Sequence, residues 1–216
     1  MVPIAFDVFG TLFDLEVLRA SARELAGERG DELYDAFYDR LQPWTWLATA
    51  AGAYRPLPQL AAEALRSAAS SLGVDRDAAP LAERLTSLPL FPEAGEALAA
   101  LSGHRLAVLS NGTAAGLEEL LSNAGVRDLF EHVLAADSVA AYKPAPEVYA
   151  LAPRAFAVPA GEVLMVSGND WDVAGAQLSG LRGAWVSRGR RLAPVLGVEP
   201  DIVVEDLSGL TFALGG

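Results

Sequence analysis

The chain of 216 residues contains no cysteine and only two histidines. The absence of cysteine excludes disulfides, thiolate metal sites and cysteine nucleophiles at once. Basic residues are scarce as well, because 16 Lys and Arg stand against 28 Asp and Glu, which gives a net charge of −12. Nucleic acids and anionic membrane surfaces both require a basic face on the protein, so this charge argues against either partner.

Long apolar segments are also lacking. No stretch approaches the roughly 18 consecutive apolar residues of a membrane span. The N-terminal sequence MVPIAFDVFG has no basic region, and its apolar run is too short for a signal peptide. We therefore expect a cytoplasmic protein with no membrane partner. Hydrophobic residues make up 52% of the chain, which is enough for a core in one domain carrying a modest insertion.

The pattern of predicted elements changes near residue 90. Residues 15–42 and 59–72 have helical spacing, and the apolar segment 43–58 between them is bracketed by prolines. Beyond this part, short apolar runs alternate with helical segments. This alternation predicts an α/β fold with a parallel sheet and helices on both faces. We expect strands at 4–10, 105–112, 130–137, 162–170, 183–189 and 201–207, and helices at 114–125, 145–157 and 171–181.

Polar residues gather where four of the predicted strands end. In an open parallel sheet, ligands bind at the edge formed by the carboxyl ends of the strands. We therefore expect these clusters to meet in one site. They are Asp7 to Thr11, Ser110-Asn111, Tyr142-Lys143 and Ser167 to Asp172.

Four segments at these places resemble the four motifs of the haloacid dehalogenase superfamily, in the same order: FDVFGTLFD, LSNGT, YKPAPEVY and VSGNDWDVAGA. Thr45-Trp46-Leu47 further resembles the TWL helix segment in the signature of the L-2-haloacid dehalogenase branch. The resemblance covers nearly the whole chain. It implies a Rossmann-like core of residues 1–14 and 90–216, with a helical cap over residues 15–89 inserted after the first motif. It also implies a homodimer, which the apolar segment 43–58 favours.

The residue types fit one chemistry. An aspartate carboxylate can displace a leaving group and form an ester that water later hydrolyses. Phosphatases of the superfamily carry a second acid two residues after this aspartate and a Mg²⁺-binding acid in the fourth motif. This chain has Phe9 and Gly168 there. Because a halide leaves without a proton and displacement at carbon needs no metal, we predict Asp7 as the nucleophile that hydrolyses a small anionic L-2-haloacid, with no metal or cofactor.

The resemblance implies the remaining roles. Thr11 would orient Asp7 or the substrate carboxylate, and Lys143 would keep Asp7 charged. The other catalytic residues would hold Lys143 and the hydrolytic water; they are Ser167, Asn169 and Asp172. Ser110 and Asn111 would bind the substrate carboxylate and the leaving halide. The full set predicted to bind substrate is Phe9, Gly10, Tyr38, Ser110, Asn111, Tyr149 and Trp171.

Two positions depart from the branch. Tyr38 stands where the branch has an arginine on the cap. Arg40 lies on nearly the opposite side of the helix and is not an easy replacement, whereas Arg55 of the next segment stays open as one. Asp170 adds a carboxylate beside the expected anion site, where it would repel a haloacid. Two alternatives therefore stay open: a phosphatase with Asp170 as its metal ligand, and a protein on the same fold without this catalysis.

Overall fold

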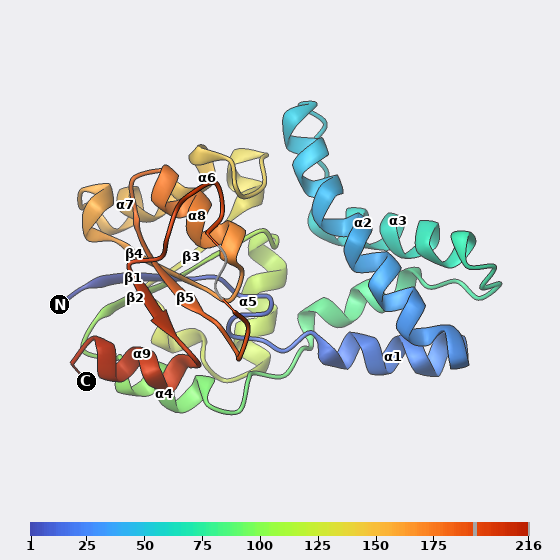
Figure 1. Cartoon of the computed structure of the whole chain (residues 1–216), viewed down its shortest axis with the longest axis horizontal. Helices are drawn as coiled ribbons and strands as arrows, with labels where there is room; N and C mark the ends of the chain where they lie inside the picture. Colours follow the sequence, from blue (N-terminus) through green and yellow to red (C-terminus); the bar gives the residue numbers. More distant parts are fainter. Residues whose placement is uncertain (192–193, 216) are drawn as a thin grey trace.

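The computed structural model describes residues 1–191 and 194–215. Its centre is a parallel sheet with the strand order β3-β2-β1-β4-β5-β6 (Figure 1). All six predicted strands are present, and each is shorter than its predicted range because the polar residues after it leave the sheet. The strands are β1 (Pro3–Phe6), β2 (Arg105–Ser110), β3 (His132–Ala135), β4 (Leu164–Ser167), β5 (Arg182–Val186) and β6 (Ile202–Val204).

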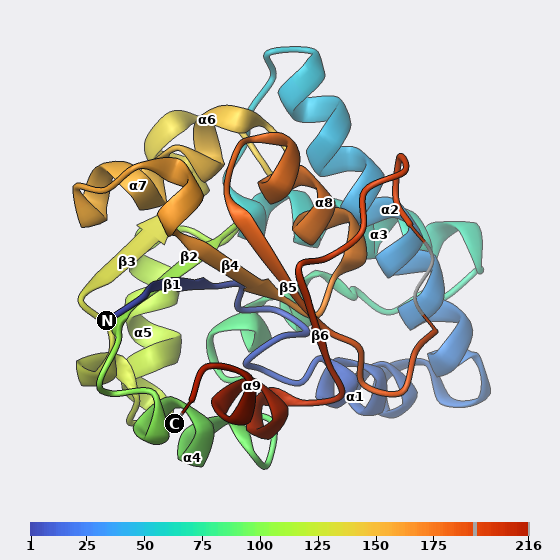
Figure 2. The same ribbon diagram turned by 60° about the vertical axis from the view of Figure 1, so that its left-hand side comes forward.

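Helices cover both faces of the sheet, as predicted (Figure 2). Successive residues of a strand point to opposite faces, so Ile4 and Phe6 belong to one apolar cluster and Ala5 to the other. The first cluster is covered by α4 (Ala94–Ala100), α5 (Ala114–Asn123) and α9 (Leu207–Ala213). The second is covered by α6 (Pro146–Tyr149), α7 (Leu151–Phe156) and α8 (Asp170–Leu178).

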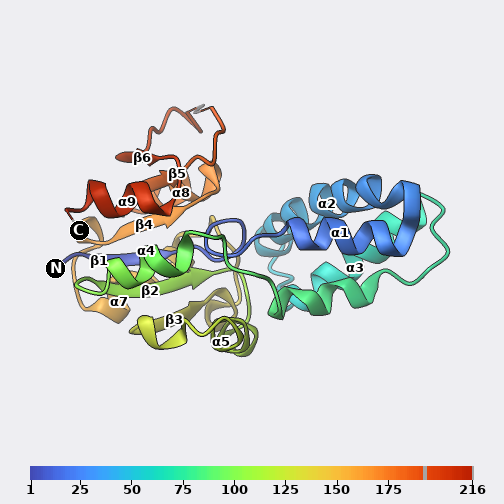
Figure 3. The ribbon, with the colours of Figure 1, turned by 90° about the horizontal axis from the view of Figure 1, so that it is seen from below.

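Three helices lie beyond the carboxyl edge of the sheet and form a separate layer (Figure 3). They are α1 (Glu16–Ala26), α2 (Gly30–Ala50) and α3 (Leu57–Ser71). Helix α2 continues through Pro43 into the proline-bracketed segment. Pro43 is exposed, and Thr45 and Ala48 in the following turns are buried. None of the helices in the described part of the chain is long and apolar enough to cross a membrane.

The chain crosses between the sheet and this helical layer twice, and the two crossings are bonded to each other. Asp14 N donates to Pro89 O at 2.9 Å, and Phe91 N donates to Leu12 O at 2.9 Å. Arg188, after β5, stacks 3.3 Å above the Phe91 ring. These contacts fix where the helical layer attaches to the sheet.

Candidate active site

Asp7 follows the central strand β1 directly and lies at the point where the strand order reverses, beside β4. Its backbone N donates to Val166 O at 2.9 Å, and its side chain is almost fully buried. The two carboxylate oxygens have different surroundings. Oδ1 accepts one hydrogen bond, from Lys143 Nζ at 3.1 Å. Oδ2 accepts three, from Thr11 Oγ1 at 2.8 Å, Asn169 Nδ2 at 3.0 Å and Ser167 Oγ at 3.3 Å.

Lys143 connects Asp7 to a second carboxylate. Its ammonium lies 3.1 Å from Asp7 Oδ1 and 3.0 Å from Asp172 Oδ2, and both ion pairs are buried. Burial alone would lower the pKa of Lys143, but the charges of Asp172 and Asp7 outweigh it and raise the pKa above its ordinary value. The ammonium therefore stays charged, which is the condition for a buried lysine to stabilise two anions.

Asp172 lies in the first turn of α8, and Tyr149 Oη donates to its Oδ1 at 2.8 Å. Burial raises the pKa of Asp172 more than the Lys143 charge lowers it, and the nearby Asp7 charge raises it further. Burial also raises the pKa of Tyr149, so its hydroxyl stays a donor. Tyr149 thus holds Asp172 in place, and Asp172 holds Lys143.

The backbone of the fourth motif lies very close to the first. A Cβ added to Gly168 would be 2.4 Å from Gly10 O, a backbone atom, and 3.4 Å from Thr11 Oγ1. Glycine at 168 therefore permits the close approach of the two loops. Gly168 N donates to Thr11 Oγ1 at 2.8 Å, and the same hydroxyl donates to Asp7. Thr11 thus links the two loops to the carboxylate.

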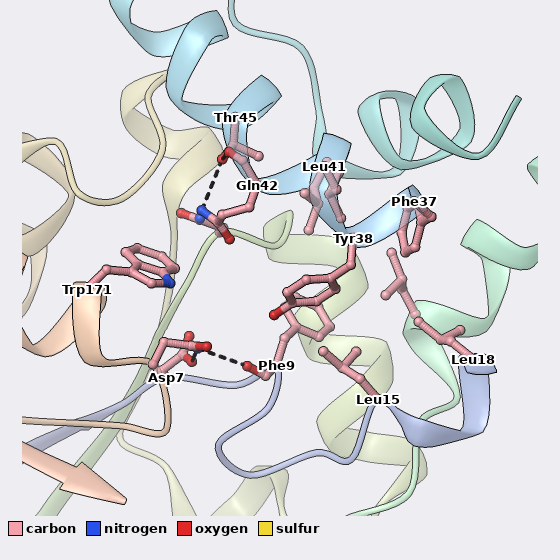
Figure 4. Close-up of a pocket in the computed structure, with 14 residues that line it drawn as sticks. Asp7, Phe9, Leu15, Leu18, Phe37, Tyr38, Leu41, Gln42, Thr45 and Trp171 are labelled. Carbon is pink, nitrogen blue, oxygen red and sulfur yellow. Dashed lines mark hydrogen bonds between the residues drawn. The ribbon is translucent and has the colours of Figure 1, made fainter. Parts of the chain in front are cut away.

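A cavity of about 70 Å³ opens between Asp7 and the helical layer (Figure 4). Its walls are mostly apolar, with Phe9 on the sheet side and Trp171 on one flank. The Trp171 ring meets Trp46 of α2 edge-on at 5.8 Å, so a cap tryptophan supports this wall from outside. The polar lining comes from two sides. Asp7, Asn111 and Asn169 come from the sheet, and Tyr38, Gln42 and Thr45 come from α2.

The structure brings the predicted residues together: some line the cavity, and the rest lie behind that lining. Phe9, Tyr38, Asn111, Asn169 and Trp171 line the cavity with Asp7. The others lie behind this lining: Thr11, Lys143, Ser167, Asp172 and Tyr149, which contact Asp7 or Asp172, and Gly10 and Ser110, which shape loops.

Asn111 and Ser110 differ in what their side chains do. Asn111 Oδ1 accepts a hydrogen bond from Lys143 N at 2.8 Å, so this residue positions the lysine loop while it lines the cavity. Ser110 Oγ accepts from Gly112 N at 3.2 Å and is fully buried. Gly10 has φ 76°, which allows the turn between Asp7 and Thr11.

The cavity residues of α2 were only partly predicted. Phe37, Leu41 and Gln42 line the cavity beside Tyr38, and they were not singled out from the sequence. The signal that finds them is helical spacing, since positions 38, 42 and 45 share one face of α2. The two arginines considered as replacements at position 38 are engaged elsewhere. Arg40 donates to Ala36 O and Ser71 Oγ, and Arg55 pairs with Glu63 at 2.7 Å.

Asp170 begins α8 and does not line the cavity. Its Oδ1 accepts a hydrogen bond from Trp171 N at 2.7 Å. Across the described ranges, no three Asp, Glu or His side chains are grouped so that they could hold a metal ion. The Asp7 carboxylate accepts hydrogen bonds from one ammonium, two hydroxyls and one amide. These surroundings fit an anionic nucleophile better than a cation site.

The sequence matches the haloacid dehalogenase-like hydrolase family over residues 4–180. It is 35% identical over 209 residues to an (S)-2-haloacid dehalogenase of Pseudomonas sp. (strain YL), covering 94% of this chain and 90% of that protein. The chain belongs to the haloacid dehalogenase-like hydrolases. The resemblance that its four motifs carry is therefore confirmed, and so is the α/β fold class.

Solved structures of the same family agree over the full length. The L-2-haloacid dehalogenase RSc1362 superposes with a TM-score of 0.95 at 36% identity, covering 100% of this chain and 99% of that one. The L-2-haloacid dehalogenase of Xanthobacter autotrophicus with chloropropionic acid covalently bound superposes with a TM-score of 0.92 at 29% identity, with the same coverage.

Proposed function

We propose that this hydrolase converts small L-2-haloacids to 2-hydroxy acids through an ester on Asp7. The observation that carries the proposal is a buried aspartate on the floor of a small apolar cavity, with Phe9 where a proton-donating acid would stand. A halide needs no proton to leave, so this reaction does not require an acid at position 9. The similarity to (S)-2-haloacid dehalogenases supports the same substrate class.

In the first step, Asp7 Oδ1 attacks C2 of the haloacid. Oδ1 accepts one hydrogen bond and keeps lone pairs for attack, whereas Oδ2 is occupied by three donors. The new O–C2 bond forms as the carbon–halogen bond breaks, and the halide leaves with that electron pair. The attack comes from the side opposite the halogen, so the configuration at C2 inverts. Lys143 holds a positive charge 3.1 Å from the attacking oxygen.

In the second step, water attacks Cγ of Asp7 and breaks its bond to Oδ1. Oδ2 is then the ester carbonyl oxygen, and the donors on it stabilise the negative charge that develops there. They are Thr11, Ser167 and Asn169. Asp172 is the second carboxylate of the site, joined to Asp7 through Lys143. It takes a proton from the attacking water and returns it to Oδ1 as the ester bond breaks, so the product leaves as a 2-hydroxy acid. Asp7 keeps the oxygen of the water and loses its remaining proton to solvent. The raised pKa of Asp172 makes it a stronger base than an ordinary aspartate.

The arrangement around the site belongs to the same proposal. Residues 15–89 act as a cap that closes over the carboxyl edge of the core, residues 1–14 and 90–216, and keeps bulk water from the ester. The small cavity supports a short substrate. Ser110 and Gly10 act through the loops that carry Asn111 and Thr11, and Tyr149 acts through Asp172. We further propose that the protein works as a cytoplasmic homodimer, a state that sedimentation analysis tests.

Incubation with L-2-chloropropionate and with haloacetates tests the reaction. We expect halide release in step with 2-hydroxy acid formation, unaffected by EDTA. A single turnover in ¹⁸O-labelled water should place ¹⁸O in the Asp7 peptide, since water attacks Cγ. Asp7→Asn should abolish release while the protein stays folded. Folded protein that releases no halide from any short haloacid would refute the proposal. EDTA-sensitive hydrolysis of p-nitrophenyl phosphate would favour the phosphatase alternative.

A further inference from the structure

Two arginines in the loop after β5 donate hydrogen bonds to backbone carbonyls beside the site. Arg188 Nη2 donates to Thr11 O at 2.8 Å, and Arg190 Nη2 donates to Gly168 O. Thr11 belongs to the first motif and Gly168 to the fourth, so one loop contacts both of the segments that meet at Asp7. Neither arginine is among the described residues that line the cavity.

Arg188 joins Thr11 to the second crossing between the sheet and the helical layer. Its Nη1 pairs with Glu93 Oε1 at 2.9 Å, and its guanidinium stacks on the Phe91 ring. The Arg188 backbone has φ 48°, a left-handed conformation that costs a non-glycine residue energy and persists only where surrounding contacts hold it. Thr11, whose carbonyl Arg188 binds, donates its hydroxyl hydrogen to Asp7 Oδ2. Arg188 is therefore one residue away from a donor of the site.

Arg190 is connected to Asp7 through a chain of hydrogen bonds. The peptide group that contains Gly168 O also contains the N–H of Asn169, which donates to Ser167 Oγ at 3.1 Å. Ser167 Oγ in turn donates to Asp7 Oδ2 at 3.3 Å. Hydrogen bonds in a chain polarise one another. A positive charge on the carbonyl therefore strengthens the donors at the far end of this chain.

Both connections end at the same oxygen, Asp7 Oδ2. In the proposed reaction Oδ1 attacks C2, and Oδ2 takes up negative charge only when water attacks the ester. Donors on Oδ2 withdraw charge from the carboxylate, so weakening them does not slow the attack of Oδ1. Weakening them slows the second step, because the charge that develops on Oδ2 is stabilised less.

We propose that Arg188 and Arg190 are positioning residues for hydrolysis of the ester: they hold the backbone of the first and fourth motifs and thereby set the donors on Asp7 Oδ2. The inference rests on the proposed ester mechanism and assigns two residues outside the four motifs to its second step. Arg188 has the larger effect, because it is partly buried and Thr11 donates to Oδ2 directly. Arg190 is exposed and acts through two further hydrogen bonds.

The test follows the ester itself. An excess of enzyme is mixed with L-2-bromopropionate and quenched in acid at intervals, and mass spectrometry measures the fraction of the Asp7 peptide that carries the ester. We expect Arg188→Met to slow decay of the ester by about 10- to 100-fold, the loss typical of a displaced catalytic group. The rate of ester formation should be unchanged. Arg190→Met should slow the decay by a smaller factor.

Steady-state kinetics give a second signature. Departure of the halide is the first irreversible step, so kcat/KM reports ester formation and should stay unchanged, while kcat and KM fall together. A residue that only supports the fold would lower kcat/KM as well. Arg182→Met is the matched control, because Arg182 is exposed at the opposite end of β5. It should leave both steps unchanged.

Two further variants separate positioning from stability. Glu93→Gln removes the ion pair but keeps Arg188 on Thr11 O, so it should lower the midpoint of thermal unfolding with little effect on ester decay. Arg188→Lys keeps the charge, but an ammonium does not reproduce the fork that binds Glu93 and Thr11 O together, so ester decay should recover only in part. If Arg188→Met does not fold, Arg188→Lys carries the test.

The outcomes are distinct. Unchanged ester decay in the folded Arg188 variants, or equal slowing of ester formation and decay, would overturn the inference. If the unmodified protein releases no halide and its Asp7 peptide carries no ester, the proposed function itself fails.

Discussion

At the scale of single residues, Gly168 leaves no room for a side chain between the first and fourth motifs. A phosphatase of the superfamily carries an acid at this position, but here the first side-chain carbon would already lie 2.4 Å from Gly10 O. The obstacle is backbone, which cannot turn away as a flexible side chain can. An acid at 168 would therefore require the first and fourth motifs to move apart.

Gly168→Ala should lower the free energy of unfolding by about 2 kcal/mol, because the methyl group forces the two loops to shift. Halide release should fall more than tenfold, since Thr11 and Asn169 would lose their positions on Asp7 Oδ2. Urea unfolding and a halide assay measure the two effects. Gly95→Ala is the matched control, because its Cβ would meet nothing within 4 Å. Retention of full stability and activity in Gly168→Ala would contradict the close approach.

The titration of Asp172 predicts that, as pH falls, activity is lost before the protein unfolds. Its folded-state pKa is raised, chiefly by burial, so the folded protein binds this proton more tightly than the unfolded chain does. Taken alone, this group favours folding as pH falls, while its protonation removes the base and a counterion of Lys143. As pH is lowered, halide release should therefore begin to decline at a pH above the ordinary aspartate pKa. Tryptophan fluorescence should still report a folded protein at that pH. Simultaneous loss of activity and fold would contradict this.

Lys143 follows the same linkage sign as Asp172, but its effect falls at alkaline pH. Its folded-state pKa is raised, so its contribution to the free energy of unfolding is complete below the ordinary lysine pKa. That contribution is lost as pH rises through the folded-state value, which lies higher. Chemical denaturation at a series of alkaline pH values should therefore show no loss from this group until the ordinary lysine range has been passed.

At the scale of elements, the end of α2 is bonded to the loop that carries Lys143. Thr49 Oγ1 accepts a hydrogen bond from Tyr142 N at 2.9 Å, and Tyr142 Oη donates to Arg55 O. The ring of Tyr54 packs on Tyr142 at 5.0 Å. Helix α2 therefore supports the position of Lys143 as well as forming the wall of the cavity.

Thr49→Val should leave Tyr142 N without its partner and lower the free energy of unfolding by about 1–3 kcal/mol. The effect on kcat should exceed the effect on KM, because the loop holds Lys143 rather than the substrate. Urea unfolding and steady-state kinetics measure both. Thr86→Val is the control, since that hydroxyl bonds to Glu83 O at the surface. An unchanged kcat together with lowered stability would show that α2 does not position Lys143.

The elements also show how far the sequence could lead. Strand-end polar clusters predicted the location of Asp7, Lys143 and Asp172, because parallel strands deliver their carboxyl ends to one edge whatever the side chains do. Which side chains reach the cavity depends on rotamers and packing. Ser110 turns to a backbone N in its own loop, and Gln42 lines the cavity from α2. Local sequence does not encode either outcome.

At the scale of the whole molecule, the net charge of −12 opposes the approach of an anionic haloacid. Screening shortens the reach of that repulsion from about 30 Å at 0.01 M ionic strength to about 8 Å at 0.15 M. KM should therefore fall about two- to threefold over this range. The value of kcat should stay constant, because the repulsion acts on the approach of free substrate and not on substrate already bound. Sodium sulfate provides the ions without adding halide. A KM that rises with sulfate would contradict the prediction.

Lys143 is the only lysine in the chain, and its side chain is 1% exposed. The chain therefore carries a single side-chain amine, and folding hides it. Succinimidyl esters applied to the folded protein should leave every side-chain amine unmodified, and acylation of the Lys143 peptide should begin only when the protein opens. Mass spectrometry can follow the rate of that acylation. This rate measures how often the folded protein opens far enough to expose Lys143 to solvent.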